Sequence, residues 1–266
     1  MDADRALMQA DAQDLKGELT FANQAAHRWD DFWRRFGGAP DLRDKTLLDF
    51  GCNRGGSVHR AMQEEAARAI GVDTNPVTTS FGSEKLSRSW GDRAQILCGD
   101  IRDLEIDPVD VVMSTNTMEH VEDIEGSLSA LVAACRPGGE LFIGFSPLWY
   151  SPYGHHHYPR TRLPWMHLLR GDDFVLDDLA RHVGLRYETL QQAGFNRATP
   201  DRFRAALAAQ DVEVLSARRN IGRSRWRSFV SQSMLALAVI PALEKYVTVG
   251  FYWHLRKPPA QKEGNS

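Results

Sequence analysis

The sequence predicts a single α/β domain built around a mainly parallel β-sheet, and three observations support this prediction. Short apolar runs alternate with longer amphipathic runs from Thr46 to Ser146, which is the rhythm of consecutive βα units. The chain has 266 residues, which suffices for one large domain and leaves little room for two. Its composition, 42% hydrophobic and 25% charged, is that of an ordinary globular protein.

Five short apolar runs in this region are expected to be strands. They are Thr46–Phe50, Ala69–Asp73, Ala94–Cys98, Val109–Ser114 and Glu140–Ser146. The clearest helix lies before the last of them, over Val121–Cys135, because its apolar residues recur at helical spacing. Pro137-Gly138-Gly139 follows this helix and is expected to end it.

The flanking segments extend the pattern on both sides. Leu19–Phe36 carries aromatic residues at near-helical spacing and stops at Gly37-Gly38, which predicts an amphipathic lead-in helix. Pro147–Pro164 is rich in Pro, Tyr and His and is expected to be a loop. The remaining expected elements are the helices Phe174–His182 and Pro200–Gln210 and the strands Val212–Arg219 and Val247–Arg256.

Charge and cysteine content exclude several classes of protein. The net charge is −3, so the chain lacks the broad positive field that attracts nucleic acid, and we expect no nucleic-acid partner. Cys52, Cys98 and Cys135 are far apart and form no CxxC pair, which argues against a disulfide framework or a zinc knuckle and favours the cytoplasm. The N-terminal residues do not resemble a signal peptide. The longest apolar run, Met234–Leu243, is about half the length that a membrane-spanning helix needs.

The sharpest local feature is the run LLDFGCNRGGS, residues 47–57, in which an apolar strand leads into a glycine-rich turn and then a helix. Glycines allow the backbone to approach a ligand closely. Alone, such a turn could serve a dinucleotide, a phosphate or only a tight βα connection. Asn53 stands where the dinucleotide fingerprint has its second glycine, and Asp49 would repel a pyrophosphate but could hold a cationic amino-acid group. A dehydrogenase is therefore disfavoured.

The segment DFGCNRG, residues 49–55, resembles the first motif of the class I S-adenosylmethionine-dependent methyltransferases, usually D-x-G-C-G-x-G. The departure at Asn53 is conservative, because Asn also tolerates left-handed backbone geometry. The resemblance implies S-adenosylmethionine as the cofactor and a Rossmann-like, seven-stranded α/β fold with an N-terminal helix and an insertion after strand 5. The residues that it implies as cofactor contacts in this motif are Asp49, Gly51, Cys52, Asn53 and Gly55.

Further motifs follow in the order of that family. The run GVD ending at Asp73 resembles the second-strand motif, whose acid binds the ribose hydroxyls. Asp100 and Ile101 resemble the motif that meets the adenine. The fourth-strand motif, which borders the transferable methyl group, is similar to residues 110–121 and implies that Asn116 contacts the cofactor. The run RPGGEL, residues 136–141, matches the turn before the fifth strand.

Each motif also has a simpler interpretation. The glycine-rich turn could be only a turn, and Asp73 and Asp100 could be helix caps. His120, which follows the fourth strand, could be a structural histidine instead of a catalytic base. Four motifs in the family's order and spacing favour the cofactor site.

The resemblance also implies a division of the chain. We expect an N-terminal helical lead-in over residues 1–40 and a methyltransferase domain over 41–257, followed by a polar tail over 258–266. The substrate-binding insertion is expected over about 147–205. Val212–Arg219 and Val247–Arg256 would be the final two strands, the last of them antiparallel.

The loop after the fifth strand is the expected acceptor site, because ligands bind beyond the carboxyl ends of the strands in open α/β sheets. It contains His155, His156 and His157, which could supply a general base, a metal ligand or a structural contact. In an extended loop His155 and His157 would point inward while His156 faces water. No partner ligands for a metal are evident. We expect His155 or His157, with His120 in reserve, to deprotonate or orient an acceptor hydroxyl, and we expect no metal.

The other candidate acceptor contacts in this loop are Trp149, Tyr150, Tyr153 and His156. Their rings could stack on a sugar, although aromatic residues near a strand end are often part of the core. The run PLWYSPYGHHHYPRTRLPW resembles an insert in bacterial methyltransferases of glycan and secondary-metabolite pathways, which favours O-methylation of a sugar hydroxyl. The acceptor would be a small molecule or a nucleotide-linked or lipid-linked glycan. The alternatives are C- or N-methylation of a small metabolite or quinone, and a methyltransferase-like binding protein without catalysis.

Five arginines and no acidic residue lie between Arg218 and Arg227, just before the apolar run Met234–Leu243. Such a segment could make peripheral membrane contact over residues 218–243, or bind the phosphates of a linked sugar. The alternative, which the family fold favours, is a helix that packs on the sheet between the last two strands. No motif indicates an oligomeric state.

Overall fold

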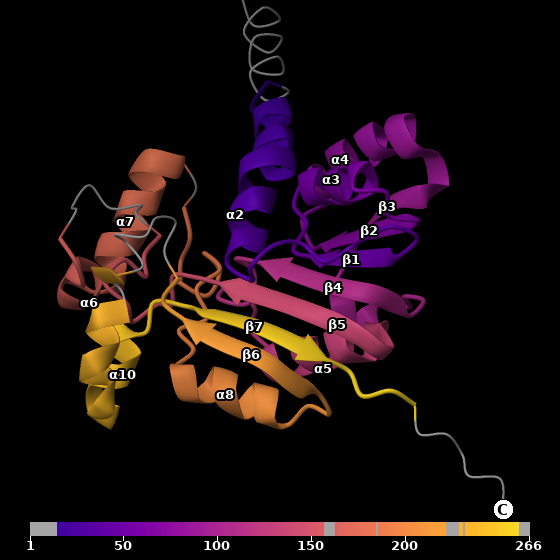
Figure 1. Cartoon of the computed structure of the whole chain (residues 1–266). Coiled ribbons are helices and arrows are strands. Elements are labelled where there is room, and N and C mark those ends of the chain that lie inside the picture. The colour runs from indigo at the N-terminus through magenta and orange to yellow at the C-terminus, as the bar shows by residue number, and fades with distance from the viewer. Residues whose placement is uncertain (1–14, 157–162, 185, 222–228, 231, 261–266) are drawn as a thin grey trace, which may run out of the picture. The chain divides into compact units, whose positions relative to one another are not determined.

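A computed structural model describes residues 15–156, 163–184, 186–221, 229–230 and 232–260, and within them seven strands form one sheet. The strand order is β3-β2-β1-β4-β5-β7-β6 (Figure 1). The strands are β1 Thr46–Phe50, β2 Arg68–Asp73, β3 Ala94–Cys98, β4 Val109–Thr115, β5 Cys135–Phe145, β6 Glu213–Arg219 and β7 Phe251–Arg256. The predicted seven-stranded α/β fold is confirmed.

The sheet is mixed. β1 pairs with β2 and β2 pairs with β3 in parallel, with Asp49 opposite Gly71 and Gly71 opposite Ile96. β6 pairs with β7 in antiparallel fashion, with one register shift between Val214 and Ser216. The antiparallel pairing expected for the last strand is therefore confirmed.

The chain divides into two compact units. The first unit contains Met1–Met113 and Ala134–Glu140, and the second contains Ser114–Ala133 and Leu141–Ser266. The cofactor motifs from Asp49 to Ile101 belong to the first unit, whereas Asn116, His120 and the histidine loop belong to the second.

The predicted lead-in helix is present in the first unit. Residues 15–23 are helical and continue into a π-helical turn, η1 (Gln24–Arg28), and into α2 (Trp29–Arg34). The chain then leaves the helix at Gly37-Gly38, as predicted, and Gly38 N donates a hydrogen bond of 2.9 Å to Trp33 O. The helix buries Trp29, Phe32 and Trp33 in the core of its unit.

Two helices connect the parallel strands of the first unit. α3 (Gly56–Gln63) joins β1 to β2, and α4 (Pro76–Trp90) joins β2 to β3 (Figure 1). α4 begins where the side chain of Asn75 accepts hydrogen bonds from two backbone amides, with Pro76 in the first turn. The strands β1 and β2 are almost wholly buried, as expected for central parallel strands.

β5 begins earlier than the sequence predicts. We expected Pro137-Gly138-Gly139 to separate the helix from a strand starting at Glu140, but β5 follows α5 (Ile124–Ala134) directly, starting at Cys135. Local contacts explain the longer strand: Arg136 forms an ion pair with Asp110 of β4. A Cβ atom at Gly139 would lie 2.7 Å from Cys135 Sγ, so only glycine fits there.

The second unit adds helices after β5. They are α6 (Met166–Arg170), α7 (Asp172–Val183), α8 (Pro200–Ala208), the 3₁₀ turn η4 (Met234–Val239) and α10 (Pro241–Val247). α8 packs on the sheet through Phe203, whose ring centroid lies 4.6 Å from that of Phe145 of β5 and 6.2 Å from that of Phe251 of β7. A separate apolar cluster joins Trp149 and Phe195 to α7. The loop expected over 147–164 has no regular helix or strand in its described residues.

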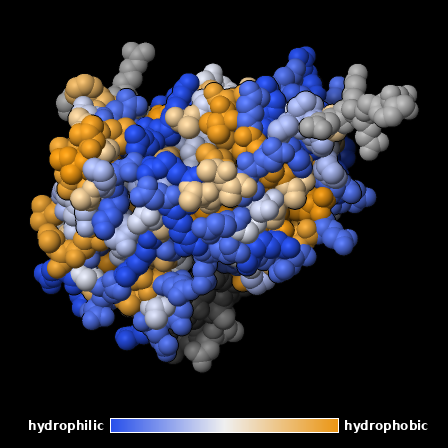
Figure 2. Space-filling model, turned by 90° about the horizontal axis from the view of Figure 1, so that it is seen from below, coloured by the Kyte–Doolittle hydropathy of each residue, from blue (hydrophilic) through white to orange (hydrophobic). Residues whose placement is uncertain are grey.

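The apolar run Met234–Leu243 is divided between the 3₁₀ turn η4 and the start of α10. η4 has no buried residue, and Val239 keeps 81% of its surface exposed. Proline at position 241 starts a new helix, α10, instead of extending the 3₁₀ turn. In Figure 2, apolar side chains gather at the left edge, where α6 and α10 lie in Figure 1. No helix among the described residues is both long enough and apolar enough to cross a bilayer.

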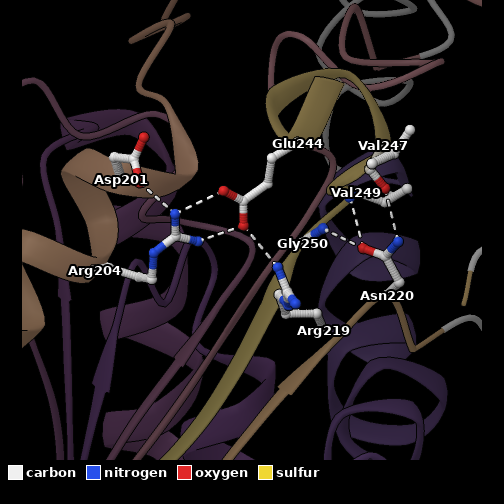
Figure 3. Close-up of polar contacts among 8 residues, drawn as sticks. All are labelled: Asp201, Arg204, Arg219, Asn220, Glu244, Val247, Val249 and Gly250. Atoms are coloured by element: carbon white, nitrogen blue, oxygen red, sulfur yellow. Dashed lines mark hydrogen bonds and ion pairs between the residues drawn. The ribbon is translucent and has the colours of Figure 1, made fainter. Parts of the chain in front are cut away.

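Polar contacts hold α10 in place (Figure 3). Both carboxylate oxygens of Glu244 accept hydrogen bonds from Arg204 of α8, at 2.7 and 2.8 Å, and Arg219 at the end of β6 adds a third of 2.8 Å. Asn220 brackets the next turn, because its amide donates to Val247 O at 2.8 Å and accepts from Val249 N at 2.7 Å. The carboxyl-terminal end of α10 is therefore fixed to the sheet.

Candidate active site

The glycine-rich turn after β1 is shaped by left-handed backbone. Gly51 and Gly55 both have φ of 76°, and Asn53 has φ of 52°. Asn53 therefore adopts the left-handed backbone geometry that was expected of it, because it replaces a glycine of the family motif. The amides of Gly51 and Cys52 both donate to Val72 O, at 2.8 and 3.1 Å, which folds the turn over the end of β2.

Asp73 ties the turn to the second strand. Its carboxylate accepts hydrogen bonds from Asn53 N at 2.8 Å and from Asn75 N at 3.0 Å. The side chain is only half-buried. Two backbone donors fix the orientation of this carboxylate while lone pairs remain for hydroxyl donors of a ligand.

Asp49 is a buried acid beneath the turn. Its side chain is 3% exposed, and burial, followed by the negative charge of Asp73, raises its pKa to about 7. A buried carboxylate is costly without a positive partner. An ammonium group bound here would supply that partner, so the site suits a cationic amino acid better than a phosphate.

The turn also fits a ligand through an unpaired polar atom. Asn53 Oδ1 is buried and has no hydrogen-bond partner within the described residues. Cys52 is different, because its thiol packs against Gly71, and burial raises its pKa well above the usual range. The Cys52 thiol therefore stays protonated and packs in the core, while its backbone shapes the turn.

Asp100 lies at the end of β3. Its carboxylate pairs with Arg102, with Nη2 2.7 Å from Oδ2, and accepts from Arg102 N at 3.0 Å. These hydrogen bonds from Arg102 lower the pKa of Asp100. Ile101 is 3% exposed and begins a short 3₁₀ turn, η3 (Ile101–Asp103), for which Asp100 is the cap. The carboxylate of Asp100 thus already caps η3. A contact with adenine would have to use the same carboxylate.

The segment after β4 begins the second unit and carries the next predicted site residues. Asn116 has φ of 50°, is exposed, and donates from its backbone to Gly144 O at 2.8 Å. Three residues later, Glu119 is 3% exposed, and neither of its carboxyl oxygens has a hydrogen bond of normal geometry in the described chain. Burial raises the pKa of Glu119 to about 8, although the nearby amides of Glu119 and Ser146 oppose the rise.

His120 has a defined tautomer. Its Nδ1 lies 2.6 Å from Gly194 O, and a carbonyl oxygen can only accept, so Nδ1 carries the proton and Nε2 the lone pair. Partial burial lowers the pKa of His120, and the hydrogen bond to Gly194 partly opposes this. The ring is neutral at pH 7 and Nε2 can accept a proton.

His155 lies elsewhere, in the core of the loop. It is fully buried, and its Nδ1 is 3.1 Å from Nδ1 of His167. His167 Nε2 is 2.7 Å from Trp149 O and must donate to it, so His167 Nδ1 accepts from His155. Burial lowers the pKa of His167, which favours the neutral form of its ring. His155 thereby braces the loop through His167.

The remaining loop residues are divided between core and pocket. Contrary to the expectation that it faces water, His156 is half-buried, and its ring centroid is 4.7 Å from that of His120. Trp149 is buried against Phe195, with ring centroids 5.0 Å apart. Tyr150 packs under Lys245, and Tyr153 is half-buried near His155. His157 lies outside the described residues.

A pocket of about 450 Å³ lies within the second unit, beside His120. Its polar lining includes His120, Glu122, Asp172, Gln191, Arg197 and Arg202. Arg197 is paired with Asp172, and Arg202 with Glu125. Because the arginines are neutralised, the pocket offers hydrogen-bonding groups without a strong net charge. Among the described residues, no three histidine, cysteine or acidic side chains form a metal-binding cluster.

Three of these features escaped the sequence analysis. Glu119 is part of the fourth-strand motif, and the signal that could have identified it is an acid next to His120, shortly after the fourth strand. His167 and Arg197 carried no such signal, since their contacts come from the folding of distant segments.

Comparison with known proteins identifies the family of the chain. The family described as "Methyltransferase domain" matches residues 21–190, more than half of the chain. The carboxy-S-adenosyl-L-methionine synthase of Shewanella sp. (strain MR-7) is 26% identical over 163 residues, which cover 54% of this chain and 67% of that protein.

Solved structures share the fold. An S-adenosylmethionine-dependent methyltransferase from Mesorhizobium loti has a TM-score of 0.54 and 14% identity, covering 85% of this chain and 95% of that one. Phosphoethanolamine N-methyltransferase 2 of Haemonchus contortus, in complex with S-adenosylmethionine, has a TM-score of 0.55 and 15% identity over 88% of this chain and 53% of that one. Since the family match includes the glycine-rich turn, Asp73 and the segment around His120, the chain belongs to the methyltransferase-domain family and is an S-adenosylmethionine-dependent methyltransferase.

Proposed function

We propose that this enzyme methylates a hydroxyl oxygen of a sugar, on a small molecule or on a nucleotide-linked or lipid-linked glycan. The observation that carries the proposal is the tautomer of His120, whose Nδ1–H is held by Gly194 O and whose Nε2 is a proton acceptor. An alcohol is a weak nucleophile until its proton leaves, so an O-methyltransferase needs such a base. Transfer to carbon or nitrogen has no comparable need.

The first unit is proposed to hold the cofactor. Asp49 would pair with the ammonium group of the methionine moiety, and Asp73 would accept from the ribose hydroxyls. Asp100 and Ile101 are proposed to meet the adenine, and Asn116 to contact the methionine moiety. When bound, the cofactor supplies an electrophilic methyl group on its sulfonium.

In this proposal Nε2 of His120 accepts the hydroxyl proton while the oxygen is aligned for attack. His156, in ring contact with His120, would orient the acceptor. Glu119, with a pKa of about 8, is mostly protonated at pH 7 and would donate a hydrogen bond instead of accepting the proton. His155 would support the loop, and His157 stays a second candidate base.

The lining of the pocket supports a neutral, hydroxyl-rich acceptor. Gln191 and Thr189 offer donors and acceptors, and Phe195 offers a ring face. The paired arginines leave little net charge to repel or trap a neutral sugar. Trp149, Tyr150 and Tyr153 are proposed to shape this side of the acceptor site.

The test is transfer from methyl-labelled S-adenosylmethionine to a panel of nucleotide-linked and lipid-linked sugars, with the methylated atom identified by NMR. We expect an O-methyl product. His120→Asn keeps a donor near Gly194 O but lacks Nε2, and should lower kcat by about 10²–10⁴-fold. His27→Asn, at an exposed histidine, is the control. A product methylated on carbon or nitrogen, or full activity of His120→Asn, contradicts the proposal.

The proposal also includes a contact with a membrane surface and a location in the cell. A lipid-linked acceptor would require contact with a membrane surface, and residues 218–243 are proposed to make it. The cytoplasm is the proposed location, because the three cysteines, all within the described residues, form no disulfide. Binding of S-adenosylmethionine without transfer to any acceptor would instead favour a binding protein.

A further inference from the structure

The lead-in helix stands beside α3 in Figure 1 and lies directly against the glycine-rich turn, within the first unit. A Cβ atom at Gly56, the first residue of α3, would lie 2.3 Å from Phe21 O and 2.5 Å from Gln24 Cβ. A Cβ atom at Gly17 would lie 3.0 Å from Arg54 Nη1 in the turn. Glycine at these two positions allows the helix to approach the turn that carries the predicted cofactor residues.

Gln24 in this helix forms a hydrogen bond with the turn. Its side chain is 5% exposed, and its Nε2 donates to Cys52 O at 3.2 Å. Because a carbonyl oxygen can only accept, this contact fixes the orientation of the amide and leaves Oε1 as an acceptor. Oε1 is buried and has no hydrogen-bond partner among the described residues. Such an acceptor is costly to the folded protein until a donor reaches it.

The backbone at Gln24 is irregular as well. Gln24 is the first residue of the π-helical turn η1 and is the buried residue of that turn. A π-helical turn inside a helix changes the direction of the side chains around it, and such turns are frequent at functional sites. A polar side chain that is buried there with half of its amide unpaired indicates a position that contacts a ligand.

The chemistry around the turn restricts the ligand group. Asp49 is a buried carboxylate, and Asn53 Oδ1 is, like Gln24 Oε1, a buried acceptor without a partner in the part of the chain that the structure describes. An ionised carboxylate or phosphate group of a ligand has only acceptors and would leave these oxygens unpaired. An ammonium group has three N–H donors and the positive charge that a buried carboxylate needs. The three acceptors therefore match one ammonium group.

We propose that Gln24 is a cofactor-binding residue that the lead-in helix contributes, and that its Oε1 accepts one N–H of the ammonium group of S-adenosylmethionine. This inference rests on the proposed cofactor site, in which Asp49 pairs with the same ammonium group. It adds a residue that lies before every motif recognised in the sequence. Since Nε2 stays bound to Cys52 O, one amide would join the helix, the turn and the cofactor.

The test is calorimetric binding of S-adenosylhomocysteine and of methylthioadenosine, which has the adenosine but lacks the amino-acid portion. The unchanged protein should bind S-adenosylhomocysteine more tightly. Gln24→Met keeps a side chain of similar length and removes the acceptor oxygen. It should weaken binding of S-adenosylhomocysteine by about 10- to 100-fold, the effect of losing one hydrogen bond to a charged group, and leave binding of methylthioadenosine unchanged.

A second variant separates ligand contact from support of the turn. Gln24→Glu keeps an acceptor oxygen whether or not the acid is protonated, so it should retain the preference for S-adenosylhomocysteine that Gln24→Met loses. Gln63→Met, at an exposed glutamine of α3, is the matched control and should bind both ligands as the unchanged protein does. Binding of methylthioadenosine also shows that each variant is folded.

Two results for the variants overturn the proposal for Gln24 and leave the rest of the cofactor site in place. One is an unchanged preference for S-adenosylhomocysteine in Gln24→Met. The other is an equal weakening of both ligands in Gln24→Met and Gln24→Glu, which would mean that Gln24 only supports the turn. If the unchanged protein binds the two ligands equally, the ammonium site itself is wrong, and the proposed pairing with Asp49 fails together with the role of Gln24.

Discussion

The backbone amide of Asn53 donates a 2.8 Å hydrogen bond to the carboxylate of Asp73, which joins the glycine-rich turn to the end of β2. The other carboxylate oxygen accepts from Asn75 N, at the start of α4. The side chain of Asp73 therefore connects the glycine-rich turn, the end of β2 and the start of α4. Both of its carboxylate oxygens act as hydrogen-bond acceptors.

Asp73→Asn tests this arrangement. An amide has only one acceptor oxygen, so its NH₂ group must face one of the two backbone donors. We expect the free energy of unfolding to fall by about 1–3 kcal/mol, and the affinity for S-adenosylmethionine to fall as the ribose contact weakens. Urea unfolding and calorimetry measure the two effects. Asp92→Asn, at an exposed acid, is the control, and unchanged stability of Asp73→Asn would show that the two hydrogen bonds carry little energy.

Cofactor affinity should depend on pH through Asp49. With its pKa at about 7, Asp49 is mostly protonated at pH 6 and must lose a proton to pair with an ammonium group. The affinity for S-adenosylmethionine should therefore rise about tenfold per pH unit up to pH 7 and level off above it. Calorimetry in buffers of different ionisation enthalpy should detect proton release at pH 6.

Asp49→Asn is the matching variant. It should bind more weakly at pH 8 and show a flat pH dependence below 7, because the side chain no longer titrates. A pH dependence that the variant retains would assign the proton to another group.

The sequence predicted the first unit well, because its information is local. Short apolar runs located β1, β2 and β3 to within a residue, and the turn after β1 has the left-handed residues that its composition requires. Asp49 and Asp73 were predicted as site residues because they lie at the carboxyl ends of two neighbouring strands, Asp49 one residue before the end of β1 and Asp73 at the end of β2.

The acceptor side could not be predicted in the same way. His155 was expected to face the acceptor, but it binds His167, twelve positions away, through a loop whose path no periodicity encodes. The pocket combines His120 with Arg197 and Arg202, which are far apart in sequence. Tertiary packing, and not local pattern, decides which histidine lies in the pocket.

Glu119 should make stability depend on pH. Its pKa is about 8 in the folded protein and 4.5 when unfolded, so the folded state binds more protons between these values. Stability contributed by this group is full below pH 4.5 and is lost as the pH rises toward 8. Glu119→Gln should remove that loss, so its urea midpoint should exceed that of the unchanged protein at pH 8 and approach it at pH 5.

The exposed acid Glu105 provides the control for this experiment. Glu105→Gln should show the same fall in midpoint between pH 5 and pH 8 as the unchanged protein. A smaller fall should remain in Glu119→Gln, because the pKa of Asp49 is also raised, to about 7. A fall as large as that of the unchanged protein would show that Glu119 does not titrate in this range.

Asn220 should be a strong point of stability in the second unit. It has φ of 57°, and its side chain forms hydrogen bonds with Val247 O and Val249 N. Asn220→Ala removes both hydrogen bonds. It also puts alanine, which tolerates left-handed backbone geometry less well than asparagine, at this position. We expect the free energy of unfolding to fall by about 2–4 kcal/mol, measured by urea denaturation.

Asn220→Gly separates the two causes, because glycine relieves the backbone strain and still lacks the side-chain bonds. It should recover about 1 kcal/mol of the loss in Asn220→Ala. Equal stability of the two variants would mean that the hydrogen bonds account for the whole effect. If both variants match the unchanged protein, Asn220 does not anchor the carboxyl-terminal end of α10, and Glu244 alone must hold the helix to the sheet.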